Sequence, residues 1–261
     1  MYYDILSMLE TLEIRELTQK ENIVEHLRLR YTLFKDAFGI DDKKGNLDLD
    51  PYDWRSHLVG IFHKGRQIAG IRVVKRQIVP QTAYALDEIR AEWDLSVRPA
   101  TGYGLPSEAV FDYQPGTRQS YLDPKAEFSR ICVLKEFRHS GVYYLAYLAA
   151  MGLTYLDGID SVLYSCPAQA LGRYARITPT LCYLDQRPEK NGFLGFTFTL
   201  PSVAVVASVI DAPHQILQQA LQVASLCRQE QTRGHATTRQ GTKVAPAFSV
   251  SGAPPIVLRH Q

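Results

Sequence analysis

The sequence predicts a mixed α/β fold in which helices cover a mixed β-sheet. Segments with apolar residues at helical spacing alternate with segments that have the pattern of strands. An early hairpin followed by longer crossovers gives a sheet with both parallel and antiparallel neighbours. The 261 residues, 46% hydrophobic and 21% charged, suffice for one globular domain, which we predict to span residues 1–231. Residues 232–261 lack apolar periodicity and are predicted to be a disordered basic tail.

The first half of the chain is predicted to contain one long helix and a β-hairpin. Residues 10–38 read as a helix because apolar side chains recur at three- and four-residue spacing. Residues 57–63 and 66–76 read as two strands joined by a turn at 64–65. The segment 41–53 carries five aspartates and has the composition of a solvated turn.

The second half is built around a predicted central strand, residues 126–134. A long irregular segment, residues 77–120, precedes this strand, and such segments are typical of lids or binding loops. Within it, residues 84–93 could form a short helix. After the central strand the patterns predict a helix at 139–157, a strand at 161–165, a helix at 168–176, strands at 180–185 and 193–200, and a helix at 211–230.

Two charged residues, Glu127 and Arg130, interrupt the apolar pattern of the central strand. Strict alternation would place them on opposite faces of the sheet. Charges inside an apolar strand are costly to bury unless they are paired, so a structural salt bridge and a functional site both explain them. The turn that follows, Arg138 to Gly141, leads into a helix, and backbone N–H groups at a helix N-terminus attract anions such as phosphate.

Composition and spacing argue against several classes of protein. The net charge is +2, from 29 basic and 27 acidic residues, so no nucleic-acid signature is present. The four cysteines form no C-x-x-C pair and the histidines have no metal-ligand spacing, so neither a metal site nor a disulfide framework is expected. We see no signal peptide and no apolar run of 18 residues, and we therefore expect a cytoplasmic protein without a transmembrane segment.

Four short motifs and the order of elements resemble one group of acyltransferases. The predicted elements follow the order of the GNAT type of acyltransferase, which is helix, hairpin, strand, R-x-x-G turn, helix, strand, helix. With the motifs, it makes the sequence resemble the acyl-homoserine-lactone synthases and their relatives, the N-acyl amino acid synthases and exosortase-associated acyltransferases. The resemblance implies a GNAT-like acyl-CoA N-acyltransferase fold. The residues that carry it are Arg30 and Phe34 (R-x-x-x-F), Asp50 and Asp53 (D-x-x-D), Gly70 and Arg72 (G-x-R), and Glu127, Ser129 and Arg130 (E-x-S-R).

Two departures from the lactone synthases favour the amino acid branch of this group. The lactone synthases usually have a tryptophan a few residues after the phenylalanine, and residues 35–40 here have none. The gap between Arg72 and Glu127 is longer than usual and holds G-L-P-S-E at 104–108, which is similar to the N-acyl amino acid synthases. The resemblance then implies transfer of a long fatty acyl group from acyl carrier protein to the amino group of an amino acid. The alternatives are a lactone synthase that uses S-adenosylmethionine and a non-catalytic acyl-binding module.

The resemblance also assigns roles to the charged residues. Glu127 is either the base that deprotonates the amine, directly or through one water, or a partner of Arg130 or Arg72 that keeps the site rigid. Ser129 and Arg130 complete the catalytic group. The substrate-binding group contains Arg30, Phe34, Asp50, Asp53 and Arg72. Within it, the aspartates would receive the ammonium of the amine substrate. Arg30 or Arg72 would pair with these aspartates or bind a carboxylate of the same amine substrate.

The part of the site that binds the carrier and its acyl thioester is predicted after the central strand, at Val133, Lys135, Arg138 and Gly141. Tyr143 stands where a small residue would widen a phosphate cradle for coenzyme A, so acyl carrier protein is the expected partner. This acidic protein would meet a basic patch of Lys135 and Arg138 with Lys75 and Arg76, whose strand ends we expect to be adjacent. A stripe at Tyr143, Tyr147, Met151 and Tyr155 is either the acyl slot or core. The reaction needs no cofactor beyond the acyl thioester substrate and a small-molecule amine, and a long-chain product would give at most weak membrane association.

Overall fold

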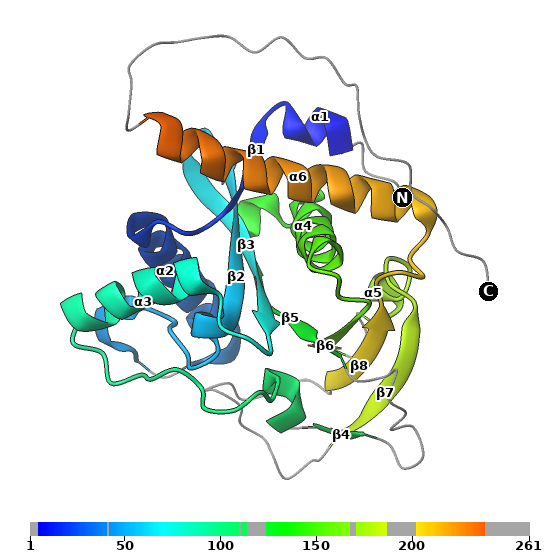
Figure 1. Cartoon of the computed structure of the whole chain (residues 1–261), viewed down its shortest axis with the longest axis horizontal. Coiled ribbons are helices and arrows are strands. Elements are labelled where there is room, and N and C mark those ends of the chain that lie inside the picture. Colours follow the sequence, from blue (N-terminus) through cyan, green and yellow to red (C-terminus); the bar gives the residue numbers. More distant parts are fainter. Residues whose placement is uncertain are drawn as a thin grey trace.

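The computed structural model describes residues 5–40, 42–109, 111–113, 124–167, 171–186 and 202–237. It contains the predicted mixed sheet, with eight strands in the order β1-β2-β3-β5-β6-β8-β7-β4 (Figure 1). Among these strands only β5 and β6 are parallel neighbours. The strands are β1 (Leu12–Glu16), β2 (Ser56–His63), β3 (Arg66–Lys75), β4 (Phe111–Tyr113), β5 (Ala126–Val133), β6 (Ser161–Pro167), β7 (Thr180–Gln186) and β8 (Ser202–Ser208). The α-helices are α1 (Ile5–Leu9), α2 (Lys20–Phe38), α3 (Pro80–Glu92), α4 (Val142–Leu156), α5 (Leu171–Tyr174) and α6 (His214–Thr237).

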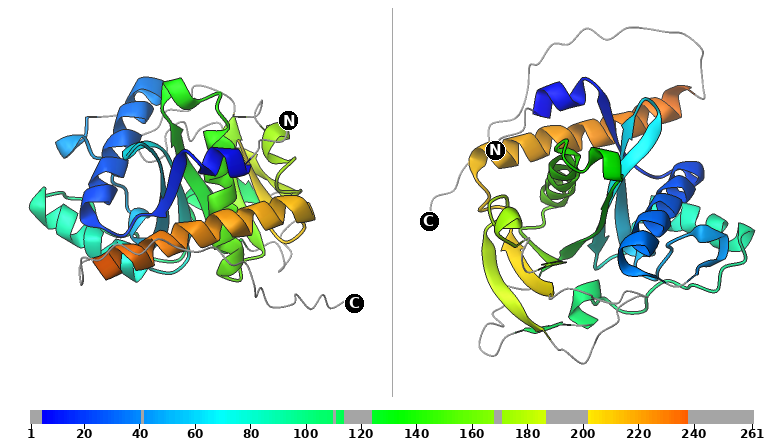
Figure 2. Two further views of the ribbon diagram at one scale, coloured as in Figure 1. Left: turned by 90° about the horizontal axis from the view of Figure 1, so that it is seen from above. Right: turned by 180° about the vertical axis from the view of Figure 1, so that it is seen from behind.

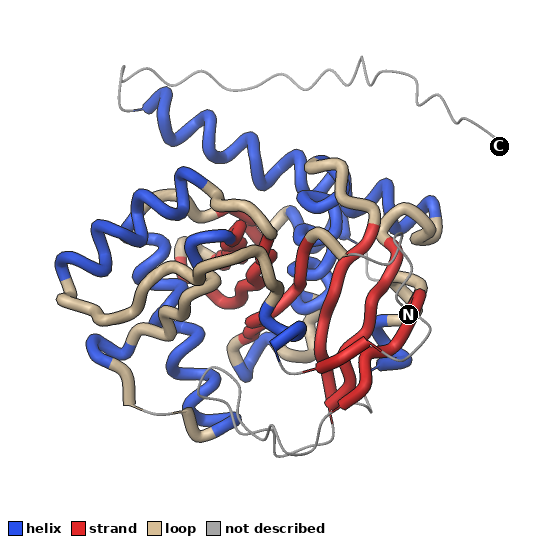
Figure 3. The backbone as a smooth tube through the Cα atoms, turned by 60° about the horizontal axis from the view of Figure 1, so that its bottom comes forward, coloured by secondary structure: helices blue, strands red, loops and turns tan. Residues whose placement is uncertain are grey.

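Helices cover both faces of the sheet, and Figure 3 shows them around the strands. On one face, called the α4 face, α4 and α6 pack in the largest apolar core with strand residues such as Val59 and Ile71. On the other, the α2 face, α2 and α3 pack in a second core that includes Leu58. At Gly152 a Cβ would lie 2.0 Å from the carbonyl oxygen of Ala220, so glycine is needed where α4 meets α6. No helix within the described ranges is long and apolar enough to cross a membrane.

The sheet opens between its two parallel strands. β5 and β6 pair only from Ala126 to Phe128, opposite Val162 to Tyr164. Beyond these pairs β6 continues alongside β8 and β5 continues alongside β3. Figures 1 and 2 show the two groups of strands spreading apart on either side of α4. The second half of β5 therefore has a backbone edge without a strand partner among the described residues.

Strand β5 carries a one-residue bulge in its middle. Between its pairs with Gly70 and Arg72, β5 holds one more residue than β3. Arg130 has a φ of 54°, in the left-handed region that such a bulge uses. Ser129 and Arg130 therefore both reach partners on the α2 face. The prediction that Arg130 and Glu127 lie on opposite faces is wrong, because strict alternation does not continue through a bulge.

Several predicted elements have different bounds in the structure. The start of the predicted helix 10–38 forms β1, in which Leu12 and Ile14 are buried and the residue between them is exposed. β8 was not predicted, and the predicted strand at 193–200 lies outside the described residues. α6 ends at Thr237, beyond the predicted domain boundary at 231. The rest of the predicted tail, 238–261, also lies outside the described residues.

A histidine on β2 connects the sheet to α4 and α6. His57 Nδ1 hydrogen-bonds to Glu16 of β1, and Nε2 hydrogen-bonds to Asp157 (3.0 Å) at the end of α4. Asp157 also accepts from Lys75 of β3 (2.7 Å) and from Arg228 of α6 (2.9 Å). Since both ring nitrogens face carboxylates, the protonated imidazolium, which has two N–H donors, fits this network best.

This network predicts a pH-dependent contribution to stability. Burial alone would lower the pKa of His57, but the hydrogen bonds to Asp157 and Glu16 outweigh it and the pKa is raised. The contribution is therefore complete below the ordinary pKa of about 6.5 and is lost as the pH rises through the raised value. We expect His57→Gln to be less stable than the wild type at about pH 6 and to approach it at about pH 9. Urea unfolding at several pH values measures this, and a pH-independent difference would contradict it.

Candidate active site

Six charged side chains meet on the α2 face and form a buried network. They come from α2, the segment between α2 and β2, β3 and β5. Five of the side chains are at most 3% exposed, and that of Arg130 is 8% exposed. The members of this charge network are Arg30, Asp48, Asp50, Asp53, Arg72 and Arg130.

Arg30 is held by two of the aspartates. Its Nε and Nη2 donate to Oδ2 of Asp48 (3.1 and 3.0 Å), and Nη1 donates to Oδ1 of Asp53 (2.7 Å). Burial alone would lower the pKa of Arg30, but the charges of Asp53 and Asp48 outweigh it and the pKa is raised. Asp48 also pairs with Lys43, so its carboxylate is shared between cations on two sides.

Arg72 and Arg130 share Asp50. Arg72 Nη1 donates to Oδ2 of Asp50 (2.6 Å), and Arg72 Nε donates to Oγ of Ser129 (2.9 Å). Arg130 Nη2 donates to the same Asp50 oxygen (3.1 Å). The Arg130 guanidinium also lies 5.6 Å from the ring centroid of Phe34, a cation–π distance. The predicted substrate-binding and catalytic residues on these elements therefore do converge.

The contacts show pairing within the network. Arg30 and Arg72 are 0% and 1% exposed, and both donate to aspartates. Of their two predicted roles, pairing with the aspartates is the one that the structure shows. The acidic segment is not the predicted solvated turn, because Asp48, Asp50 and Asp53 are all buried. Sequence reasoning missed Asp48, although its place two residues before the D-x-x-D pair was a usable signal.

Gly70 has a steric reason to precede Arg72 on β3. A Cβ at Gly70 would lie 2.4 Å from Cε1 of His26, which α2 presses onto the strand. His26 is fully buried, and burial followed by the charge of Arg30 lowers its pKa well below the ordinary value. A neutral His26 against a glycine thus lets α2 approach β3 closely enough for Arg30 to reach the aspartates.

Glu127 is a buried carboxylate held by an uncharged residue. Ser107 donates its backbone N–H to Oε2 (2.8 Å) and its hydroxyl to Oε1 (2.8 Å). No cation among the described residues pairs with Glu127, so the predicted pairing with Arg130 or Arg72 is absent from this part of the chain. Burial raises the pKa of Glu127 to about 7. Burial, and then the charge of Glu127, also raise the pKa of Tyr52 nearby. Sequence reasoning identified neither Ser107 nor Tyr52 as a site residue.

The predicted donor-side residues lie around the end of β5 and the start of α4. Val133 is half-buried, and Lys135 and Arg138 are exposed. Gly141 adopts a φ of 83° as the N-cap of α4, and no side chain caps this helix. A left-handed residue here favours glycine and leaves the first N–H groups of α4 open to an anion.

The basic patch predicted from four residues does not assemble. β3 and β5 are antiparallel, and Lys75 pairs with Ala126 at the start of β5. Lys75 and Arg76 therefore lie at the opposite end of these strands from Lys135 and Arg138. The two residues are also engaged elsewhere, Lys75 with Asp157 and Arg76 with Glu108. Of these four residues, Lys135 and Arg138 remain for an acidic partner near the end of β5.

Burial decides between the two interpretations of the stripe on α4, and it also determines how reactive Cys132 can be. Tyr147 and Met151 lie in the main core at 1% and 0% exposure, so the stripe on α4 is core at these positions. Cys132 is buried, and burial raises the pKa of its thiol to about 12. Such a thiol is a poor nucleophile at neutral pH.

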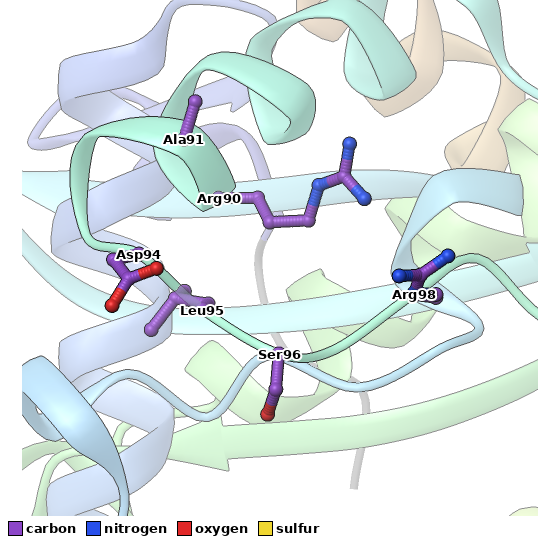
Figure 4. Close-up of a pocket in the computed structure, with 6 residues that line it drawn as sticks. All are labelled: Arg90, Ala91, Asp94, Leu95, Ser96 and Arg98. Atoms are coloured by element: carbon purple, nitrogen blue, oxygen red, sulfur yellow. The ribbon is translucent and has the colours of Figure 1, made fainter.

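A pocket of about 310 Å³ opens elsewhere on the surface, after α3 (Figure 4). No residue of the charge network lines it, and neither does Glu127. Its lining residues are Arg90, Ala91, Asp94, Leu95, Ser96 and Arg98. Within the described ranges no group of three His, Cys, Asp or Glu side chains is arranged to hold a metal ion.

Known structures resemble the chain in fold. A CoA-dependent acyl-homoserine lactone synthase, BjaI, solved with SAM and isopentyl-CoA, matches 82% of this chain and 89% of its own, with a TM-score of 0.51 and 14% identity. The chain has the GNAT-like acyltransferase fold. FeeM, an N-acyl amino acid synthase from uncultured soil microbes, matches 82% of this chain and 97% of its own, with a TM-score of 0.45 and 13% identity. An acetyltransferase of the GNAT family from Staphylococcus aureus matches 76% and 99%, with a TM-score of 0.41 and 8% identity.

Sequence comparisons found no match to a family model or to a curated protein. The predicted resemblance is confirmed through structure, and the likeness to BjaI, at 14% identity, establishes the fold. In this GNAT-like fold, the bulge on β5, the opening between β5 and β6 and the buried Glu127 lie together in the middle of the sheet. The function of the chain is therefore inferred from these residues.

Proposed function

We propose that the chain is an N-acyltransferase that moves a long fatty acyl group from acyl carrier protein to the amino group of an amino acid. The observation that carries the proposal is Glu127. Its buried carboxylate titrates near neutral pH and lies one residue before β5 and β6 stop pairing. An amine nucleophile arrives as an ammonium ion and must lose a proton, so a base at this place is what the reaction needs.

The amine side of the reaction uses Glu127 with its neighbours. The carboxylate accepts a proton from the ammonium, directly or through one water, and the free amine attacks the thioester carbonyl. The C–N bond forms and the C–S bond breaks. The carrier leaves as a thiolate and takes up the second proton, which the nitrogen loses as the amide forms. Ser129 accepts from Arg72 Nε, so its hydroxyl hydrogen is free to donate to the substrate. Arg130, the most exposed of the three network arginines, would contact the amino acid carboxylate.

The thioester side uses the edge of β5 that has no strand partner within the described ranges. The amide groups of a pantetheine arm can add to an open strand edge as a short extra strand, and residues up to Val133 offer such an edge. The arm's phosphate would then meet the N-terminus of α4 at Gly141. Lys135 and Arg138 lie exposed beside this helix end, where an acidic carrier protein would dock.

The test is the product of a defined reaction. Purified protein is incubated with palmitoyl-acyl carrier protein and either mixed amino acids or S-adenosylmethionine, and the products are identified by mass spectrometry. We expect an N-palmitoyl amino acid, and palmitoyl-coenzyme A should be a poorer donor. Glu88→Gln, on the exposed side of α3, is a matched control for Glu127→Gln and should retain activity.

Other products would identify other functions. Release of methylthioadenosine with a lactone would identify a lactone synthase. The protein could also bind the acyl carrier without any transfer, at every pH tested and with both acceptors. This result would support an acyl-binding module and contradict the proposal.

A further inference from the structure

We propose that Ser107 is a positioning residue that keeps the Glu127 carboxylate ionised and fixed in direction for proton transfer. The inference rests on the proposed function, since it concerns how the base of that reaction is prepared. Ser107 belongs to the G-L-P-S-E segment, residues 104–108, which resembles the N-acyl amino acid synthases but has been assigned no chemical role so far. The structure places it directly against Glu127.

Ser107 contacts both oxygens of the carboxylate. The N–H and the hydroxyl each donate over 2.8 Å, to different oxygens, and Ser107 and Glu127 are only 2% and 1% exposed. A carboxylate held at both oxygens cannot rotate freely, so its direction is set by the backbone position of Ser107. Both donors favour the charged form of the carboxyl group, whereas burial opposes it.

The segment that carries Ser107 is itself fixed to the sheet. Arg55 donates to the carbonyl oxygens of Gly102 (3.0 Å) and Gly104 (2.6 Å). Arg76 donates to Glu108 (2.8 Å), and Glu108 in turn accepts from the N–H of residue 105 (2.8 Å). Two arginines on the sheet side therefore hold the residues on both sides of Ser107. The segment acts as a fixed support for Glu127.

Glu127 takes no part in the ion pairs of the nearby charge network. Burial raises its pKa, and the Ser107 hydrogen bonds and then the charge of Arg72 oppose that rise. Arg72 and Arg130 lie near Glu127 on the α2 face of the sheet, but both donate to Asp50 and neither donates to Glu127. Direct pairing with a guanidinium would hold Glu127 ionised too strongly for it to take a proton from an ammonium. Two uncharged donors stabilise the carboxylate less than a guanidinium would. The carboxylate therefore keeps enough proton affinity to take a proton from an ammonium at neutral pH.

The experiment measures the protonation of Glu127 without any substrate. The free energy of unfolding is determined by urea between about pH 5 and pH 9 for the wild type, Ser107→Ala, Glu127→Gln and the double variant. A carboxyl with a raised pKa makes stability fall with rising pH until the pH passes that pKa. We expect Ser107→Ala to move the end of this fall upward by about one pH unit, because one donor to the carboxylate is lost. In the Glu127→Gln background, Ser107→Ala should leave the pH dependence unchanged.

Controls distinguish this role from simple packing. Ser56→Ala also removes a buried hydroxyl, one that donates to the carbonyl oxygen of Tyr52, and should lower stability equally at every pH. Ser107→Thr keeps a hydroxyl donor and should keep the wild-type pH dependence. If Ser107→Ala does not fold, Ser107→Cys, a weaker donor, should give a smaller upward shift.

The outcomes also separate this inference from the proposed function. A Ser107→Ala profile that coincides with the wild type would overturn the role of Ser107, whatever the enzyme acylates. A shifted unfolding profile in a protein without acyl transfer would support the contact and contradict the proposed function. With activity present, the acid limb of kcat/KM should move upward with the unfolding profile.

Discussion

Replacing Glu127 by glutamine is expected to remove most of the turnover and, above neutral pH, to make the folded protein more stable. The amide cannot accept a proton, so kcat should fall by about 10²- to 10⁴-fold, the usual contribution of a general base. Burial raises the pKa of Glu127 to about 7, so in the wild type its stabilising protonated form is present at low pH and is lost as the pH rises through that value. A neutral glutamine escapes this loss, which amounts to roughly 3 kcal/mol at about pH 8.

Two measurements on the same pair of proteins check this expectation. Urea unfolding should show the stability gain of Glu127→Gln at about pH 8 and its disappearance near pH 5. Single-turnover acyl transfer should show the loss of rate. A variant that loses activity and is destabilised at every pH would mean that Glu127 holds the structure together and is not a base. Glu88→Gln should change neither property.

The second large effect is expected from the charge network. Asp53→Asn keeps the shape of the side chain and its contact with the Asp50 N–H, but removes the charge that faces both Arg30 and Arg72. Breaking a buried ion pair from one side leaves an uncompensated buried charge and costs about 3–5 kcal/mol. This is a large share of the stability of an ordinary domain. We expect a large drop in the unfolding midpoint, measured by urea or heat.

Asp42→Asn is the matched control for this prediction. Asp42 pairs with Lys35 in an exposed position, where water screens the interaction, so its loss should not change the midpoint measurably. If Asp53→Asn were as stable as Asp42→Asn, the network would not be the scaffold that its contacts indicate.

Much of the fold was predictable because it depends on local patterns. The hairpin of β2 and β3, the strand β5 and the helix α4 each carry a clear apolar period, and all three are present. The strand β1 was missed because its alternating residues are followed almost at once by the helical pattern of α2. The two patterns were therefore taken as one helix. β8 was missed because an apolar run with a proline at 201 does not show where pairing begins.

Most charged members of the site were predictable, but Asp48, Ser107 and the contacts between the residues were not. Charges in apolar surroundings must be paired, and this drew attention to Arg72, Glu127 and Arg130. Which partner each one has depends on distances between segments far apart in the chain. Asp50 and Arg130 are 80 positions apart, and Ser107 and Glu127 are 20 apart. Nothing in the local pattern of Ser107 indicates that a serine is the partner of the buried carboxylate.

The bulge on β5 affects how this chain should be aligned with relatives. Past Arg130, Ile131 packs in the core on the α4 face, and Cys132 packs with Phe34 on the α2 face. A regular strand of the same length would place these two residues the other way round. An alignment against a homologue without the bulge therefore needs a one-residue gap next to Arg130. Without that gap, residues from opposite sides of the sheet share alignment columns, and conservation of the core is scored as conservation of the site.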